Sequence, residues 1–186
     1  MPNWCNNTIT ISGQTETIKN LWESATAEDG GLLSAMSPQP KDMFHGNLGE
    51  KERKECEAKG IPNWYDWNVS NWGTKWDVST EGLEYKDNGD GTASIEGWFD
   101  SAWAPPIGAY NTFCEDMDGV YLEAFYEEPG MCFVGCWDSE GGDDYYEYTD
   151  CDSNTIRDVV PDYLVDQFEL DQRMAEWEDE TEEVVE

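Results

Sequence analysis

The chain has 186 residues and carries 42 acidic against 10 basic side chains, which gives a net charge of −32 and a pI near 4.1. This length is typical of one domain with an appended element. An aromatic content of 13% argues against a disordered chain. No apolar run approaches the roughly 20 residues that a membrane span needs, and the charge disfavours direct binding to nucleic acid, because phosphates require a basic surface.

The N-terminus, Met1-Pro2-Asn3-Trp4-Cys5, has neither the basic stretch nor the apolar segment of a secretory signal. We therefore expect a cytoplasmic protein. The six cysteines include no CxxC pair, and a reducing compartment disfavours disulfides between them. The one histidine, His45, lies in a loop-like stretch, so we expect no metal site and no cofactor.

Alternation of apolar and polar residues from Trp4 to Ser12 predicts a first strand. An apolar stripe beginning at Ile18 predicts an amphipathic helix that ends at Gly30-Gly31. Residues 31–50 are interrupted by Pro and Gly and predict an irregular connection, and a short charged helix is predicted over Glu50–Lys59.

Strands are predicted over Trp76–Lys86 and Thr92–Asp100. The turn Asp87–Gly91 joins them, because its Asn and Gly residues tolerate the positive φ that a hairpin requires. A short helix over Ile107–Met117 follows, and further strands are predicted over Val120–Tyr126, Met131–Trp137 and Tyr145–Thr149. Pro161 suits the first turn of a last helix, expected to reach about Glu178, and the acidic end, Glu178–Glu186, is expected to be frayed.

In this order the elements match a split βαβ motif, so we expect an α+β protein with a ferredoxin-like antiparallel sheet packed by two helices. The ferredoxin-like domain is expected over residues 1–150, with a Trp-rich insert at 29–75. An acidic helical extension is expected over residues 151–186. The order of elements alone also fits other α+β folds.

Three tryptophan-bearing segments occur at Met1–Asn6, Asn71–Asp77 and Phe99–Pro106, with the sequences MPNWCN, NWGTKWD and FDSAWAPP. Together they resemble the YubB-like family of small proteins carried by bacteriophages and plasmids. The resemblance spans roughly residues 1–137 and implies a ferredoxin-like domain and an origin in a mobile element. It implies no catalytic residues, and the acidic part after Thr149 does not belong to the family pattern.

The tryptophans also define a candidate aromatic surface, namely Trp64, Trp67, Trp72, Trp76 and Trp103. Exposed rings beside a cation such as Lys75 can stack on the bases of single-stranded nucleic acid or on the faces of sugars. The alternative, which we favour, is that these rings fill the space between the insert and the sheet.

Residue patterns for catalysis and for metal binding are weak. One histidine leaves no His–Ser or His–Cys arrangement, and no glycine-rich phosphate loop is present, so we do not expect an enzyme. The acidic loops Asp87–Gly91 and Asp138–Asp144 contain oxygen ligands that calcium prefers. Neither loop follows EF-hand spacing, and turn chemistry explains both.

The charge is concentrated in the C-terminal part. Residues 1–114 hold 17 acids and 8 bases, a net of −9, whereas residues 115–186 hold 25 acids and 2 bases, a net of −23. On one helix, Asp158, Asp162, Asp166 and Glu169 would form a row with about 5.4 Å per turn. Duplex DNA carries a charge every ~1.7 Å, so a single row is too dilute to copy a duplex, whereas two rows, or this row beside the 138–152 cluster, would approach the density of one strand.

We therefore expect a phage or mobile-element accessory protein that binds its target stoichiometrically. It would act as an acidic nucleic-acid mimic and block a basic host protein, either a nucleic-acid-handling or a defence factor. The expected contacts are Asp143, Asp144, Glu147, Asp158, Asp162, Asp166 and Glu169.

Two simpler explanations of the charge are a solvated shell that keeps the protein soluble and a disordered tail. Two other functional classes also remain. One is a phage structural or assembly protein that packs through its Trp-rich surface. The other is a small enzyme or ligand-binding module that uses a tryptophan cleft.

Overall fold

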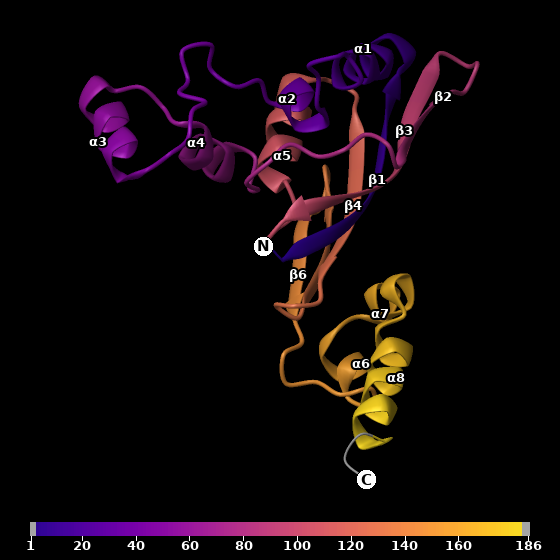
Figure 1. Cartoon of the computed structure of the whole chain (residues 1–186). Coiled ribbons are helices and arrows are strands. Elements are labelled where there is room, and N and C mark those ends of the chain that lie inside the picture. Colours follow the sequence, from indigo (N-terminus) through magenta and orange to yellow (C-terminus); the bar gives the residue numbers. More distant parts are fainter. Residues whose placement is uncertain (1–2, 184–186) are drawn as a thin grey trace.

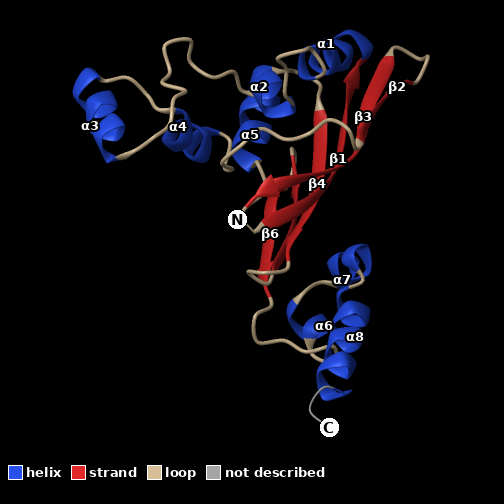
Figure 2. Cartoon of the chain, viewed as in Figure 1, coloured by secondary structure: helices blue, strands red, loops and turns tan. Residues whose placement is uncertain are grey.

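The computed structural model describes residues 3–183. It confirms a mixed α+β protein with one six-stranded antiparallel sheet, and the described residues also form eight helices (Figure 1 and Figure 2). The strands are β1 (Trp4–Gln14), β2 (Leu83–Asp87), β3 (Thr92–Ala102), β4 (Tyr121–Glu128), β5 (Phe133–Asp138) and β6 (Gly142–Glu147). The helices are α1 (Thr15–Ala25), α2 (Leu32–Met36), α3 (Glu50–Lys59), α4 (Trp64–Asn71), α5 (Ile107–Asp116), α6 (Ile156–Val159), α7 (Asp162–Phe168) and α8 (Leu170–Glu183).

The strands lie in the order β2-β3-β1-β4-β5-β6, and each neighbouring pair is antiparallel. The first strand of the chain is therefore central, with Ile9 opposite Gly97 on one side and opposite Ala124 on the other. The hairpin predicted between β2 and β3 is confirmed, and the Asn88 N–H closes its turn by donating to the Thr92 carbonyl at 3.0 Å.

One face of the sheet is covered by α1, α2 and α5. Alternate residues of β1, including Ile9 and Ile11, point to this face because side chains alternate along a strand. They meet the buried stripe of α1, which begins at Ile18 and Leu21. The main core lies between these layers.

The opposite face is covered only over β4–β6, where α6, α7 and α8 pack. Val134 and Cys136 alternate with core residues of β5, so they point to this second face and contact a separate apolar cluster that includes Leu164, Val165 and Leu170. Figure 1 shows these helices, in yellow, beside one end of the sheet. The outer face of β1–β3 consequently remains open.

An ion pair between a buried carboxylate and a half-exposed arginine links α8 to the sheet. The side chain of Glu127 in β4 is only 1% exposed, and its two carboxylate oxygens meet the two terminal nitrogens of Arg173. The Tyr148 hydroxyl donates to the same carboxylate at 2.9 Å. Because each oxygen has a partner, the desolvation of this charge is compensated.

Several predicted boundaries are wrong, and in two cases a tertiary contact accounts for the difference. The last helix, expected to run unbroken from Pro161 to about Glu178, is divided into α7 and α8 at Glu169, whose φ is 51°. This break lets α7 lie on β5 while α8 turns so that Arg173 reaches the sheet. The strand expected from Trp76 begins only at Leu83, because Asp77 instead accepts hydrogen bonds from the N–H groups of Leu33 and Ser34 at 2.8 and 2.9 Å.

The segment expected as an insert, residues 29–75, holds α2, α3 and α4, and α3 stands away from the sheet (Figure 2). At the acidic end, where fraying was expected, α8 continues to Glu183. Residues 184–186 and the first two residues of the MPNWCN segment lie outside the described part of the chain. No helix within residues 3–183 has both the length and the apolarity that crossing a bilayer requires.

The ion pair leads to a stability prediction. Replacing Arg173 with methionine leaves the Glu127 carboxylate buried without its cation, and we expect the free energy of unfolding to fall by about 3 kcal/mol. Urea denaturation measures this change. Adding Glu127→Gln should restore most of the loss, because the neutral amide still accepts from the Tyr148 hydroxyl. Equal stability of the Arg173→Met variant and the wild type would contradict the role given to the pair.

Candidate functional site

The strand β6 carries three of the predicted contact residues at an edge of the sheet, since β5 is its only strand partner in the described chain. Asp143, Asp144 and Glu147 are all exposed. Because neighbouring residues of a strand point to opposite faces of the sheet, Asp143 and Asp144 are contacted by tyrosines from different elements. Tyr126 of β4 donates to Asp143 at 2.5 Å, and Tyr163 of α7 donates to Asp144 at 2.6 Å.

Tyrosine hydroxyls hold all three carboxylates of β6. Besides those two bonds, Tyr146 donates to Asp144 at 2.8 Å and Tyr145 donates to Glu147 at 2.9 Å. A hydrogen bond to a charged acceptor is stronger than one between neutral groups. A phenol carries no charge near neutral pH, so it positions a carboxylate without neutralising it. The edge of the sheet therefore presents full negative charges in fixed positions.

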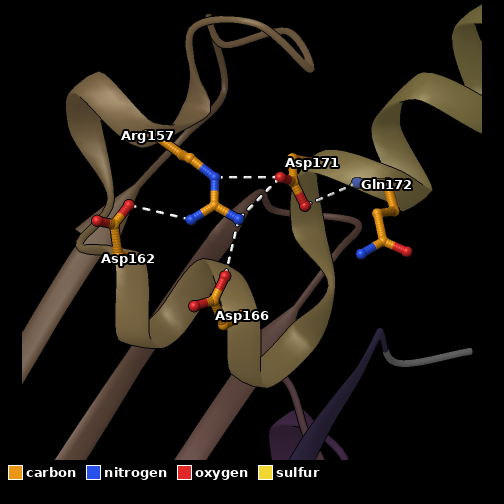
Figure 3. A network of polar contacts seen from close by, with 5 residues as sticks. All are labelled: Arg157, Asp162, Asp166, Asp171 and Gln172. Carbon is orange, nitrogen blue, oxygen red and sulfur yellow. Dashed lines mark hydrogen bonds and ion pairs between the residues drawn. The ribbon is translucent and has the colours of Figure 1, made fainter.

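The remaining predicted contact residues lie on the C-terminal helices and at the α7–α8 junction. Arg157 pairs with two of them, Asp162 and Asp166 (Figure 3). Its guanidinium donates to Asp162 at 3.0 Å, to Asp166 at 2.7 Å and to Asp171 at 2.8 and 3.1 Å. The side chains of Asp162 and Asp166 remain 77% and 67% exposed, so both still face solvent.

This arrangement corrects the expected single row of carboxylates. Asp158 lies in α6, Asp162 and Asp166 lie in α7, and Glu169 occupies the junction with α8. The chain changes direction at Val160 and Pro161, where the backbone is extended. The four carboxylates therefore do not form a line along one helix: Asp162 and Asp166 pair with Arg157, whereas neither Asp158 nor Glu169 makes an ion pair with it in the described chain.

The charges around Arg157 are coupled. The hydrogen bonds that Arg157 donates to Asp166, Asp171 and Asp162 raise its pKa, and the pKa of Asp171 is lowered first by accepting from that guanidinium. The other arginine of the C-terminal part, Arg173, is engaged by Glu127. Both basic side chains of residues 115–186 are thus already paired.

Many exposed carboxylates between residues 138 and 180 have no ion pair with Lys or Arg within residues 3–183. They are Glu140, Asp143, Asp144, Glu147, Asp150, Asp152, Asp158, Glu169, Glu176, Asp179 and Glu180. We call the seven predicted contact residues on β6 and α6–α8 the acidic C-terminal surface. The surrounding carboxylates extend its negative charge.

The candidate aromatic residues divide between core and surface. Trp72 is buried and its indole N–H donates to the Ser37 carbonyl at 2.8 Å, while Trp67 packs edge-on against it. Trp64 is half-buried and donates to the Gly46 carbonyl at 3.1 Å. Trp76 and Trp103 are each 38% exposed. Only these last two rings offer a substantial open surface.

Lys75 lies against the exposed rings. Its ammonium nitrogen is 4.3 Å from the ring centroid of Trp76, 5.3 Å from that of Trp103 and 5.8 Å from that of Tyr65. Such contacts are favourable cation–π interactions. The protein's own lysine therefore already occupies the position that a cation would take among these rings.

The three tryptophan-bearing segments meet at this place. Trp4 packs against Trp76 with ring centroids 6.1 Å apart, and the Trp103 N–H donates to the Asn3 carbonyl at 3.0 Å. The Thr74 hydroxyl donates to the Ala102 carbonyl at 2.8 Å. Residues that are far apart in the sequence thus form one continuous contact.

Sequence reasoning missed the tyrosines that position the carboxylates. Two of these pairs, Tyr145 with Glu147 and Tyr146 with Asp144, are two residues apart on one strand, so their spacing was available as a signal. The hydrogen bonds made by Tyr126 and Tyr163 depend on strand register and on the packing of α7, and no local sequence pattern predicts them.

The two acidic loops follow turn chemistry. Asp138 accepts from the Glu140 N–H at 2.8 Å, and Asp90 accepts from the Thr92 N–H at 3.0 Å. Such bonds from an aspartate to the backbone are typical of turns. Across residues 3–183, no three His, Cys, Asp or Glu side chains are arranged to hold a metal ion.

The tyrosine–carboxylate bonds lead to a prediction at alkaline pH. Burial and the bond to Glu147 raise the pKa of Tyr145 from its ordinary 10.0 to about 12, and burial followed by the bonds to Asp143 and Asp144 raises the pKa of Tyr126 and Tyr163. A raised pKa means that the stabilisation is complete below pH 10 and is lost as pH rises through about 12. Tyrosinate absorbance and thermal melting should therefore show late ionisation and falling stability in this window. A native titration curve that matches the curve in guanidinium would contradict the prediction.

Comparisons with known proteins give little further information. No protein-family model and no curated protein sequence matches the chain. Among solved structures, the chain resembles the protein api92 from Yersinia pseudotuberculosis, of the family DUF1281, at 12% identity and a TM-score of 0.46. The match covers 81% of this chain and 99% of that one. Similarity at this level carries no conclusion about function.

Proposed function

We propose that this protein is a non-enzymatic accessory protein that binds its target stoichiometrically. Its acidic C-terminal surface would occupy the basic, nucleic-acid-binding groove of a host protein, either a nucleic-acid-handling or a defence factor. The proposal rests on the high density of exposed carboxylates around β6 and α6–α8. Both arginines of this region are already paired with other carboxylates. Unpaired negative charge of this density complements a surface built to bind phosphates.

The positions of the carboxylates favour binding over simple solubility. A solvated shell requires charge but no particular geometry. On β6, however, tyrosine hydroxyls hold Asp143, Asp144 and Glu147, which reduces the entropy lost when a partner docks. The long-range field of the same surface would speed the encounter with a basic partner.

The proposal extends to the fold family and to the origin of the protein. The strand order β2-β3-β1-β4, with α1 and α5 as the connecting helices, supports a ferredoxin-like arrangement. The contact between the segments around Trp4, Trp76 and Trp103 supports the YubB-like resemblance. On this basis the protein would belong to a phage or another mobile element and act in the cytoplasm of the host.

The test removes charge without removing structure. Truncation at Pro161 would strip Leu164, Val165 and Leu170 from the second apolar cluster, so a loss of binding by that variant would be ambiguous. The combined substitutions Asp158→Asn, Asp162→Asn, Asp166→Asn and Glu169→Gln avoid this problem. We expect this variant to lose a basic partner that the wild type captures from a bacterial lysate at low salt and releases at high salt.

A matched control keeps the net charge change equal. The substitutions Glu16→Gln, Glu28→Gln, Asp42→Asn and Glu57→Gln also remove four exposed carboxylates, but from the N-terminal part, where none of them is in an ion pair of the described chain. This control should retain the partner. Nucleic acid that binds the captured protein should compete with the wild type. Equal capture by both variants, or no competition, would refute the mimic.

A further inference from the structure

The outer face of β1–β3 is a second charged surface, on the side of the sheet where α6–α8 cover only the other strands. Its residues include Glu84 of β2, Glu96 and Trp98 of β3, and Thr10 of β1. A hollow of about 680 Å³ is lined by these residues together with Glu81. An adjoining hollow of about 470 Å³ shares Glu81 and Trp98 and extends to Trp4.

The carboxylates of this face oppose one another. Glu84 lies directly across from Glu96 in the β2–β3 ladder, a position in which side chains are about 5 Å apart and like charges destabilise the sheet. No ion pair with Lys or Arg in the described residues involves Glu81, Glu84 or Glu96. Lys86 is the one basic residue that lines the larger hollow. The Ser94 hydroxyl donates to Glu96 at 2.7 Å. The face thus keeps two carboxylates directly opposite each other with no ion pair in the described residues, and such local conflicts are characteristic of functional surfaces.

Trp98 provides a fixed aromatic platform beside these carboxylates. Its side chain is 61% exposed, yet one side of the indole lies against Gly82, where an added Cβ would come within 3.0 Å of the ring. The backbone N–H of Trp98 donates to the Gly82 carbonyl at 3.1 Å, which keeps the two backbones together beneath the ring. The backbone therefore supports the ring from one side and leaves the other side to a ligand.

We propose that this open face binds an arginine-bearing segment of a partner protein, with a guanidinium stacked on Trp98 and paired with Glu84 and Glu96. Arginine fits better than lysine, because its planar group stacks on an indole and forms two parallel hydrogen bonds to a carboxylate. Nucleic acid is disfavoured by the three carboxylates, and a second copy of this chain is disfavoured by its net charge of −32. The inference does not depend on the proposed function, because the acidic C-terminal surface lies on other elements.

The experiment measures the fluorescence anisotropy of a labelled peptide of alternating Arg and Ser at low salt. A peptide with citrulline in place of arginine keeps the shape and removes the charge. We expect the full chain to bind the arginine peptide, with Trp98→Ala weakening it about tenfold. Glu84→Gln with Glu96→Gln should weaken it by about as much. The control Glu115→Gln with Asp118→Asn removes two exposed carboxylates from the α5–β4 region, and it should change affinity by less than about twofold.

Two further measurements, the melting temperature of the Glu84→Gln, Glu96→Gln variant and peptide binding by the C-terminal variant, exclude unfolding and nonspecific binding as explanations. The Glu84→Gln, Glu96→Gln variant should melt at a higher temperature than the wild type, since the repulsion is relieved, so its loss of binding cannot come from unfolding. The variant lacking charge at Asp158, Asp162, Asp166 and Glu169 should bind the peptide nearly as the wild type does, which separates this inference from the proposed function. Equal binding of the citrulline peptide, unchanged binding by Trp98→Ala, or preference for a labelled single-stranded oligonucleotide would overturn the inference.

Discussion

The buried carboxylate of Glu127 organises the C-terminal third of the chain. It is the point where β4, the segment after β6 and α8 meet, because Tyr148 and Arg173 both converge on it. A charge with so little solvent must be matched by fixed partners, and this requirement sets the direction of α8. The direction of α8 in turn places Leu170 in the second apolar cluster and the turn at Glu169 beside α7. The acidic surface therefore depends on a charge that is not part of it.

The molecule handles its negative charge in three different ways. Arg157 neutralises part of the cluster on α7 and α8 through exposed, salt-sensitive pairs, which contribute little to stability. Tyrosine hydroxyls on and around β6 hold carboxylates without reducing their charge. On the outer face of β2 and β3, Glu84 and Glu96 lie opposite each other with no ion pair in the described residues, and the Ser94 hydroxyl donates to Glu96. The degree of compensation thus differs from surface to surface, which a uniform solubilising shell would not require.

Local patterns predicted the elements that depend on local physics. The alternation in β1, the apolar stripe of α1 and the Asn-Gly turn before β3 were all visible in the sequence, because each follows from backbone periodicity or from residues that tolerate positive φ. The break at Glu169 was not visible, since it is imposed by the reach of Arg173 to a distant strand. For the same reason the residue types of the acidic surface were predicted but its shape was not. The predicted row is divided among α6, α7 and the α7–α8 junction, and of its four members only Asp162 and Asp166 pair with Arg157 within residues 3–183.

The central place of β1 has a consequence for how the chain folds. Trp4 pairs with Ala102, and Asn6 pairs with Glu127, so the first strand to be synthesised finds its two neighbours only after most of the chain exists. Until then Ile9 and Ile11 have no sheet to enter, and contacts of this sequence separation form slowly because a long loop must close first. The strong negative charge of the later segments repels other copies of the chain during that interval. Completion of the central pairings of β1 is therefore a late event in folding.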